Sequence, residues 1–176
     1  MKRRQFILSL FAAGVGARAV LSSTSTSATT RLPAIGSPPV PLNKSKAEWK
    51  TLISADRYDV LFEEATERPR SSPLNTEKRD GTFVCAACNL PLFKSTHKYE
   101  SGTGWPSFFD VIAGAVATKK DFKHIFPRTE YHCARCRGHQ GHVFDDGPAP
   151  TRLRYCNNGL ALLFVAADTP LPALRS

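Results

Sequence analysis

The cysteines are the residues of this chain whose type and spacing point most directly to chemistry. Four of the five form two CxxC pairs, Cys85 with Cys88 and Cys133 with Cys136, and the fifth, Cys156, stands alone in the segment RYCNNGLALLF. A CxxC turn points both sulfurs in one direction, so two facing turns can close a tetrahedron of thiolates around Zn²⁺. The pairs therefore predict a metal site, and the single cysteine needs a separate explanation.

The N-terminus predicts an export signal. Residues 1–19 read MKRRQFILSLFAAGVGARA, with a basic start, an apolar stretch too short to span a bilayer and an A-x-A cleavage site. The adjacent Arg3 and Arg4, followed by QFI, are typical of a twin-arginine signal, with an ordinary Sec signal or an anchor as the alternative. We expect a periplasmic protein with a flexible Ser/Thr/Pro-rich linker over residues 20–43, a folded domain over 44–168 and a tail over 169–176.

The separation of the two CxxC pairs leaves other arrangements open. Forty-four residues lie between Cys88 and Cys133, more than in the commonest zinc ribbons. Two disulfides or one redox-active CxxC are the alternatives, and an exported destination by itself favours disulfides. Twin-arginine export carries folded proteins, however, so zinc could bind in the cytoplasm while the thiols are reduced. We expect structural zinc, because four thiolates leave no open position for catalysis.

The charge balance does not indicate a nucleic-acid partner. The net charge is +9, but four of the 24 basic residues lie in the leader, so 20 remain against 15 acidic residues. A net charge of about +5 is usual for a solvated surface. With 41% apolar residues in 176, the chain has enough hydrophobic material for one folded domain.

Two glycine-rich segments gather further polar and aromatic residues. SGTGWPSFFD, residues 101–110, describes a rigid loop that presents Trp105, although a tryptophan there could equally belong to a core. GHQGHVFDDGP, residues 138–148, carries His139 and His142, which could also form a second metal site or lie free on the surface.

The element pattern predicts helices first and strands afterwards. Ser45 and Glu48 form a capping box for one helix, Ser54 can cap a second, and Pro69 and Pro73 end helical character. After residue 81 the pattern changes to short β-prone pieces separated by turn residues: TFVC, PLFKS, GAVAT, TEYHC, GHVF, LRYC and LALLFV. The fold class is therefore mostly β, an α+β arrangement of two small antiparallel sheets with helices at one end.

Several blocks together resemble the B-type methionine sulfoxide reductases. They are CAACNLPLFKSTHKYESGTGWPSF, RTEYHCARCRGHQGHVFDDGP and RYCNNGLAL, preceded by a helical segment that also matches, and they cover about residues 45–165 in the family's order. The resemblance implies reduction of the R epimer of methionine sulfoxide, usually within a protein, back to methionine. It also implies a β-tent fold with a zinc clip of four cysteines.

The resemblance implies a role for each remaining polar residue. Cys156 is the nucleophile, because a soft thiolate can attack the sulfoxide sulfur and carry its oxygen away as a sulfenic acid. One or both of His139 and His142 donate protons to that oxygen, directly or through water. Asn158 hydrogen-bonds into the same site and holds it in register. The resemblance also implies that Trp105 supplies an apolar wall for the substrate methyl group. Apart from the resemblance, Arg154 and the two histidines are candidates for a positive charge that favours the thiolate.

Three departures from the family pattern concern the site. Thr103 stands where many relatives carry the cysteine that resolves the sulfenic acid, Gln140 replaces a usual leucine, and Asn157 replaces a usual valine or isoleucine. We expect an external reductant of the thioredoxin-like or glutaredoxin-like type, oxidised proteins as substrates, and a monomer. Rival interpretations are a zinc-ribbon binding module and an exported thiol–disulfide oxidoreductase; the latter would purify without metal.

Overall fold

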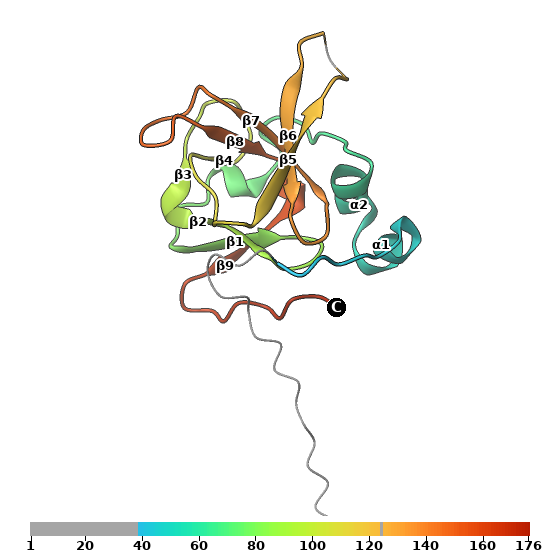
Figure 1. Ribbon diagram of the computed structural model, residues 1–176. Helices are drawn as coiled ribbons and strands as arrows, with labels where there is room; N and C mark the ends of the chain where they lie inside the picture. Colours follow the sequence, from blue (N-terminus) through green and yellow to red (C-terminus); the bar gives the residue numbers. More distant parts are fainter. Residues whose placement is uncertain (1–38, 124) are drawn as a thin grey trace, which may run out of the picture.

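The computed structural model describes residues 39–123 and 125–176. The predicted signal peptide over residues 1–19 and most of the predicted linker lie outside the described residues. Within the described ranges, no helix combines the length and the apolar character needed to cross a membrane. The described residues form the domain that carries both the CxxC pairs and the lone cysteine (Figure 1).

The first helix, α1 (Lys46–Leu52), begins as the sequence predicts. The Ser45 side chain accepts from the Glu48 backbone N–H, and the Glu48 carboxylate accepts from the Ser45 backbone N–H at 2.8 Å, which completes the capping box. Trp49 is the buried residue of this helix, and its ring stacks on Phe62 with centroids 5.1 Å apart. This contact fixes α1 against the end of the second helix.

The second helix, α2 (Ala55–Phe62), also begins at the predicted residue but is capped differently. The Ser54 side chain makes no capping hydrogen bond; its hydroxyl donates to the Asp56 carboxylate. The helix ends well before Pro69, and Pro73 opens a short 3₁₀ turn, η1 (Pro73–Asn75), instead of excluding helical structure. A proline is tolerated there because the first helical position needs no backbone N–H.

The β-prone pieces form two antiparallel sheets, which confirms the predicted fold class. The smaller sheet has the order β2-β1-β9, and the larger has the order β3-β4-β8-β7-β6-β5. The strands are β1 (Gly81–Cys85), β2 (Pro91–Lys94), β3 (Lys98–Tyr99), β4 (Ser107–Phe108), β5 (Val116–Asp121), β6 (Arg128–Cys133), β7 (His139–Phe144), β8 (Arg154–Asn157) and β9 (Leu162–Ala166). Short 3₁₀ turns η2 (Ser95–His97) and η3 (Gly159–Ala161) precede β3 and β9.

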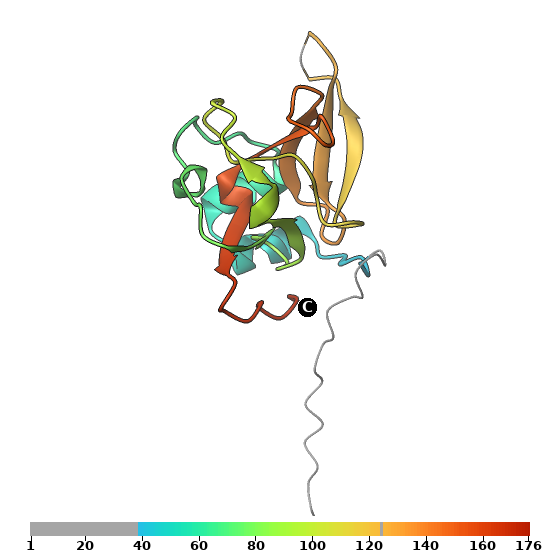
Figure 2. The ribbon, with the colours of Figure 1, turned by 90° about the vertical axis from the view of Figure 1, so that its left-hand side faces the viewer.

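An aromatic core joins the two sheets. Phe93 of β2 stacks on Phe108 of β4 with ring centroids 4.1 Å apart, and Phe83 of β1 meets Phe108 edge-on at 4.9 Å. Tyr131 of β6 lies edge-on to Tyr155 of β8 at 5.2 Å. Figure 2 shows the long β5–β6 hairpin at one side of the body and the helices at the other. The two sheets therefore share one aromatic core, and burial of that core stabilises both of them.

Chain segments on both sides of the predicted domain limits contact the cysteine turns. The Leu42 N–H donates to the Arg135 carbonyl at 2.7 Å, and the Arg175 N–H donates to the Cys88 carbonyl at 3.1 Å. The Arg135 guanidinium in turn donates to the Arg175 carbonyl at 2.6 Å. Residues 42 and 175 are therefore held on the same part of the fold.

Candidate active site and metal site

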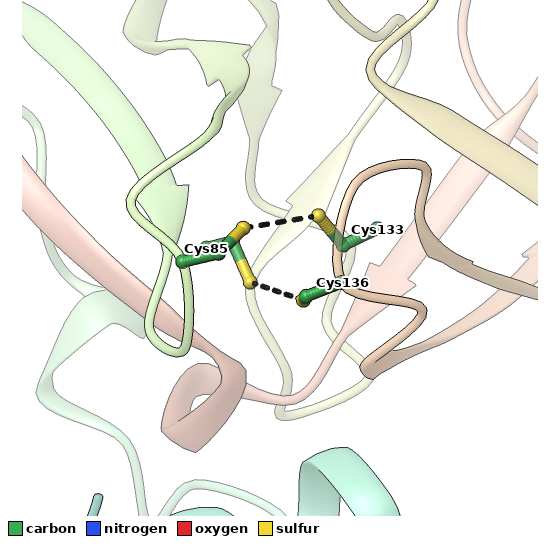
Figure 3. Close-up of side chains that lie close together, drawn as sticks. Cys85, Cys133 and Cys136 are labelled. Atoms are coloured by element: carbon green, nitrogen blue, oxygen red, sulfur yellow. Dashed lines mark hydrogen bonds between the residues drawn. The ribbon is translucent and has the colours of Figure 1, made fainter. Parts of the chain in front are cut away.

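The four paired cysteines converge at one point. Cys85 ends β1 and Cys133 ends β6, and each CxxC turn continues into Cys88 or Cys136. Their sulfurs all lie within 4.8 Å of one another, with 3.6 Å between Cys85 Sγ and Cys136 Sγ and 3.5 Å between Cys88 Sγ and Cys133 Sγ. Figure 3 shows side chains from the two turns pointing toward each other.

This geometry can be tested against a tetrahedral metal. With Zn–S bonds of about 2.3 Å, the edges of a tetrahedron of sulfurs are about 3.8 Å, close to the observed separations. All four cysteines are buried and none forms a disulfide. Hydrogen bonding among the crowded sulfurs raises the pKa of Cys85 and lowers the pKa of Cys88. The four residues are positioned to bind a metal.

Gln140, one of the departures from the family pattern, contacts this cluster. Its side chain is fully buried, and its Nε2 lies 3.6 Å from Cys85 Sγ and 3.4 Å from the Gly138 carbonyl. A metal-bound thiolate accepts hydrogen bonds from such donors, which orient it and reduce its charge. The replacement of leucine by glutamine therefore acts on the metal site.

The lone cysteine lies in a row of side chains across the larger sheet. Antiparallel pairing places Cys156 of β8 opposite Ser107 of β4 on one side and opposite His142 of β7 on the other. His142 in turn pairs with Glu130 of β6, which pairs with Lys119 of β5. Directly opposite residues share a face with Cβ atoms about 5 Å apart. Five strands thus each supply one polar side chain to a single row across the sheet.

A register shift explains how both histidines reach one side of the sheet. Residues three apart on a regular strand point to opposite faces, but the β6–β7 pairing shifts between Tyr131 and His132. The rings of His139 and His142 consequently lie 5.5 Å apart by centroid. Of the two histidines, His142 lines the pocket beside Cys156. His139 is 3% exposed and lies behind His142, outside the pocket lining.

Each histidine has a carboxylate partner. His142 Nε2 lies 2.7 Å from Asp121 Oδ2, and His139 Nδ1 lies 3.1 Å from Glu130 Oε1. Burial lowers the pKa of His142, and the Asp121 contact opposes that effect in part. Asp121 also accepts from Arg128 at 3.2 Å, so its pKa is held low by its backbone and side-chain donors. The Asp121 hydrogen bond fixes how the His142 imidazole is oriented, whereas Glu130 lies beside His139 without such a bond.

The candidate pocket is a small cavity of about 190 Å³ beside Cys156. Among the predicted site residues its lining includes Trp105, His142, Arg154 and Asn158 together with Cys156. Burial raises the pKa of the Cys156 thiol, while the neighbouring Arg154 charge lowers it. The structure thus brings together five of the six predicted catalytic and substrate-binding residues and leaves His139 outside the lining.

Arg154 is itself held in place. Its guanidinium makes two 2.7 Å contacts with the two carboxylate oxygens of Asp146 and lies 4.3 Å from the centre of the Phe144 ring. This bidentate contact fixes the charge near the Cys156 sulfur. Thr103 approaches the same sulfur, with its Oγ1 4.0 Å from Cys156 Sγ, where many relatives have a cysteine.

Glu67 connects the pocket walls and was not predicted from the sequence. Its carboxylate accepts from the backbone N–H groups of Gly159 at 2.6 Å and Leu160 at 2.9 Å. Its backbone carbonyl accepts from the Trp105 indole at 3.1 Å, and its N–H donates to Asn158 Oδ1 at 3.1 Å. A single acidic residue in a loop carries no periodicity or motif, so only the tertiary contacts identify it.

The two asparagines after Cys156 have their side chains engaged within the protein. Asn158 Nδ2 donates to the Gln140 carbonyl at 3.1 Å, so this residue ties β7 to the loop around Glu67. Asn157 accepts from the Tyr131 hydroxyl at 2.6 Å beneath the pocket. Asn158 therefore lines the pocket while its side chain bonds to the backbone on both sides of it; its role in the reaction stays a prediction.

Fold and site define a class of protein: a small β domain with four cysteines positioned to bind a metal and a separate thiol in a pocket beside a histidine and a tryptophan. The SelR domain model matches residues 53–166. The peptide methionine sulfoxide reductase MsrB of Methanosarcina barkeri is 49% identical over 124 residues, covering 70% of this chain and 87% of the relative. The MsrB of Agrobacterium fabrum is 47% identical over 124 residues, covering 70% and 92%. The chain belongs to the SelR family of B-type methionine sulfoxide reductases.

Proposed function

We propose that this peptide methionine sulfoxide reductase acts on protein-bound methionine-R-sulfoxide and uses Cys156 as its nucleophile. One observation carries the proposal: the Cys156 thiol lines a pocket of about 190 Å³ together with His142 and Trp105. A cavity of that size accommodates one side chain. The thiol supplies the nucleophile, the imidazole can handle protons, and the indole offers an apolar wall.

The chemistry balances with a single thiol. The Cys156 thiolate attacks the sulfoxide sulfur, the S–O bond breaks, and the oxygen is transferred to Cys156 as a sulfenic acid. The substrate sulfur gains two electrons and the cysteine sulfur loses two. His142, oriented by Asp121, delivers the proton that the departing oxygen requires. His139, buried behind it, supports the orientation of that ring.

Choice of epimer follows from the fixed position of Trp105. Its indole N–H donates to the Glu67 carbonyl, so the ring cannot turn away from the pocket without losing that bond. The methyl group and the oxygen of the sulfoxide exchange places between the two epimers. Only one epimer then directs its methyl group to the indole and its oxygen to His142, and the proposed reaction assigns that position to the R epimer.

The four-cysteine cluster is proposed to hold structural Zn²⁺. Its sulfur separations fit a tetrahedral thiolate site, and its ligands close that site completely. When bound, the metal supplies binding free energy that stabilises the two hairpins bearing the cysteines. It takes no part in the reaction.

Turnover is proposed to require an external thiol reductant of the thioredoxin-like or glutaredoxin-like type. Thr103 presents a hydroxyl beside the Cys156 sulfur, and the other four cysteines are committed to the metal site. The reductant thiol therefore attacks the sulfenic acid, releasing water and forming a mixed disulfide. A second reductant thiol then releases Cys156. Trapping the sulfenic acid with dimedone after one equivalent of substrate supports this order; a stoichiometric internal disulfide contradicts it.

Export to the periplasm by the twin-arginine route and a monomeric state are proposed from the sequence alone. Changing Arg3 and Arg4 to lysine should retain the precursor in the cytoplasm, and unimpaired export would favour the Sec route.

The decisive experiment is an assay of both epimers of dabsyl-methionine sulfoxide with dithiothreitol as reductant. Wild type should consume the R epimer only, and Cys156→Ser should lose turnover while it retains metal and melting temperature. Thr103→Ser, which preserves the neighbouring hydroxyl, is the matched control and should remain active. Turnover by Cys156→Ser would exclude the proposed nucleophile, and a metal-free wild type would favour the rival oxidoreductase.

A further inference from the structure

The tip of the β5–β6 hairpin exposes an unusual concentration of apolar side chains. Phe122 is 73% exposed, Ile125 is 94% exposed and Phe126 is 80% exposed, all within five positions of the chain. The hairpin projects from the body of the domain (Figures 1 and 2). A clustered apolar surface of this kind usually marks a binding site, because water contact with it is costly.

A groove at the base of this tip shares two wall residues with the active-site pocket. The groove has a volume of about 830 Å³, and its lining includes Ile125, Phe126, Val143 and Leu153. Arg128 and Phe144 line both this groove and the 190 Å³ pocket that contains Cys156. The two cavities therefore border each other at these two side chains, and the larger one is mainly apolar.

The sizes of the two cavities are consistent with a polypeptide substrate. The smaller holds one side chain, so the residues that flank a methionine sulfoxide in a polypeptide must lie outside it, each about 3.3 Å further along an extended chain. Methionine is mostly a core residue, and its oxidation to a polar sulfoxide disrupts that core. The segments that such damage exposes are apolar on both sides of the oxidised residue.

We propose that the groove and the hairpin tip form a docking site for unfolded polypeptide with apolar residues flanking the methionine sulfoxide. The inference rests on the proposed function and adds a specificity site to it. The flanking side chains pack against Ile125 and Phe126 while the sulfoxide enters the pocket past Phe144. Binding energy gained outside the pocket raises kcat/KM for such segments above that for an isolated methionine sulfoxide.

The test compares three substrates. They are N-acetyl-methionine-R-sulfoxide, a peptide with leucine and valine flanking a methionine-R-sulfoxide, and a matched peptide with glycine and serine flanks. Wild type should prefer the apolar peptide over the polar one by about tenfold in kcat/KM, as expected if parts of two apolar side chains are buried. The double variant Ile125→Ser/Phe126→Ser should lose that preference and keep its rate on the N-acetyl substrate. The control Val40→Ser, at a residue 81% exposed, should behave as wild type.

Each outcome separates the docking site from the activity itself. Equal kcat/KM for the two peptides in wild type, or a preference that survives in the double variant, overturns the docking site while activity on the N-acetyl substrate stands. Inactivity on that substrate overturns the proposed function instead. Phosphatidylglycerol vesicle binding or self-association lost in the double variant, with the peptide preference unchanged, would assign the tip to a membrane or a second copy and overturn the proposal.

Discussion

Removing the carboxylate of Glu67 should destabilise the fold and misplace the pocket walls. Glu67 is 8% exposed, and Glu67→Ala leaves the N–H groups of Gly159 and Leu160 without their acceptor. A hydrogen bond to a charged group contributes about 1.5–3 kcal/mol. Because Leu160 is partly exposed and water can replace one bond, we expect a loss of about 3 kcal/mol in the free energy of unfolding. Glu67→Gln retains one acceptor oxygen and should lose about half of that.

The same substitution should also reduce catalysis. The two carboxylate bonds hold the Glu67 loop in place, and the backbone of that loop anchors Trp105 and Asn158. A displacement of about 1 Å at a reacting centre can lower kcat/KM about 100-fold. Urea unfolding of the metal-loaded protein, followed by tryptophan fluorescence, measures the first effect, and R-epimer kinetics measure the second. Glu100→Ala, at an exposed residue, is the control and should change neither. Glu67→Ala with wild-type stability, or with lower stability and unchanged kcat/KM, would refute the reasoning.

Three further outcomes are expected. Arg154→Met removes the charge that lowers the pKa of Cys156, so that pKa rises further and iodoacetamide alkylation at neutral pH slows, about tenfold per pKa unit, recovering as pH rises through the new pKa. An unchanged alkylation profile would exclude Arg154 as the activating charge. Cys88→Ser opens the sulfur cluster, so elemental analysis should find metal lost and thermal melting should show a large destabilisation; retained metal would contradict the site. Gln140→Leu deletes the donor to Cys85, so a chelator should remove metal about tenfold faster, with unchanged release as the contrary result.

Local signals in the sequence predicted the elements better than their arrangement. The capping box at Ser45 and Glu48 and the seven β-prone pieces correspond to observed helix and strand positions, because capping and β-propensity act over a few residues. The strands β3 and β4 have two residues each and show no alternation that sequence could reveal. The sheet orders depend on contacts between distant segments, so the local pattern does not contain them.

The site was predicted mainly through motifs, and its supporting residues were not. Cys156, Trp105 and His142 stand in recognisable segments and do meet in one pocket. Asp121 and Glu130 lie on strands where charged residues read as solvated surface, and only the sheet register brings them to the histidines. The same register decides that His139 lies behind the pocket, which residue type and spacing cannot indicate.

The register of β7 against its neighbours has a consequence for how this domain can evolve. Cys156 and His142 face each other through the β7–β8 pairing, and Gly141 permits that close approach, since a Cβ there would lie 1.9 Å from the Cys156 carbonyl oxygen. Deleting or inserting one residue in β7 would turn every later side chain to the opposite face. Many single substitutions in these strands leave the partners opposed, whereas a change of length separates them at once. Length variation in this family should therefore collect in the loops, with the lengths of β6 to β8 kept constant.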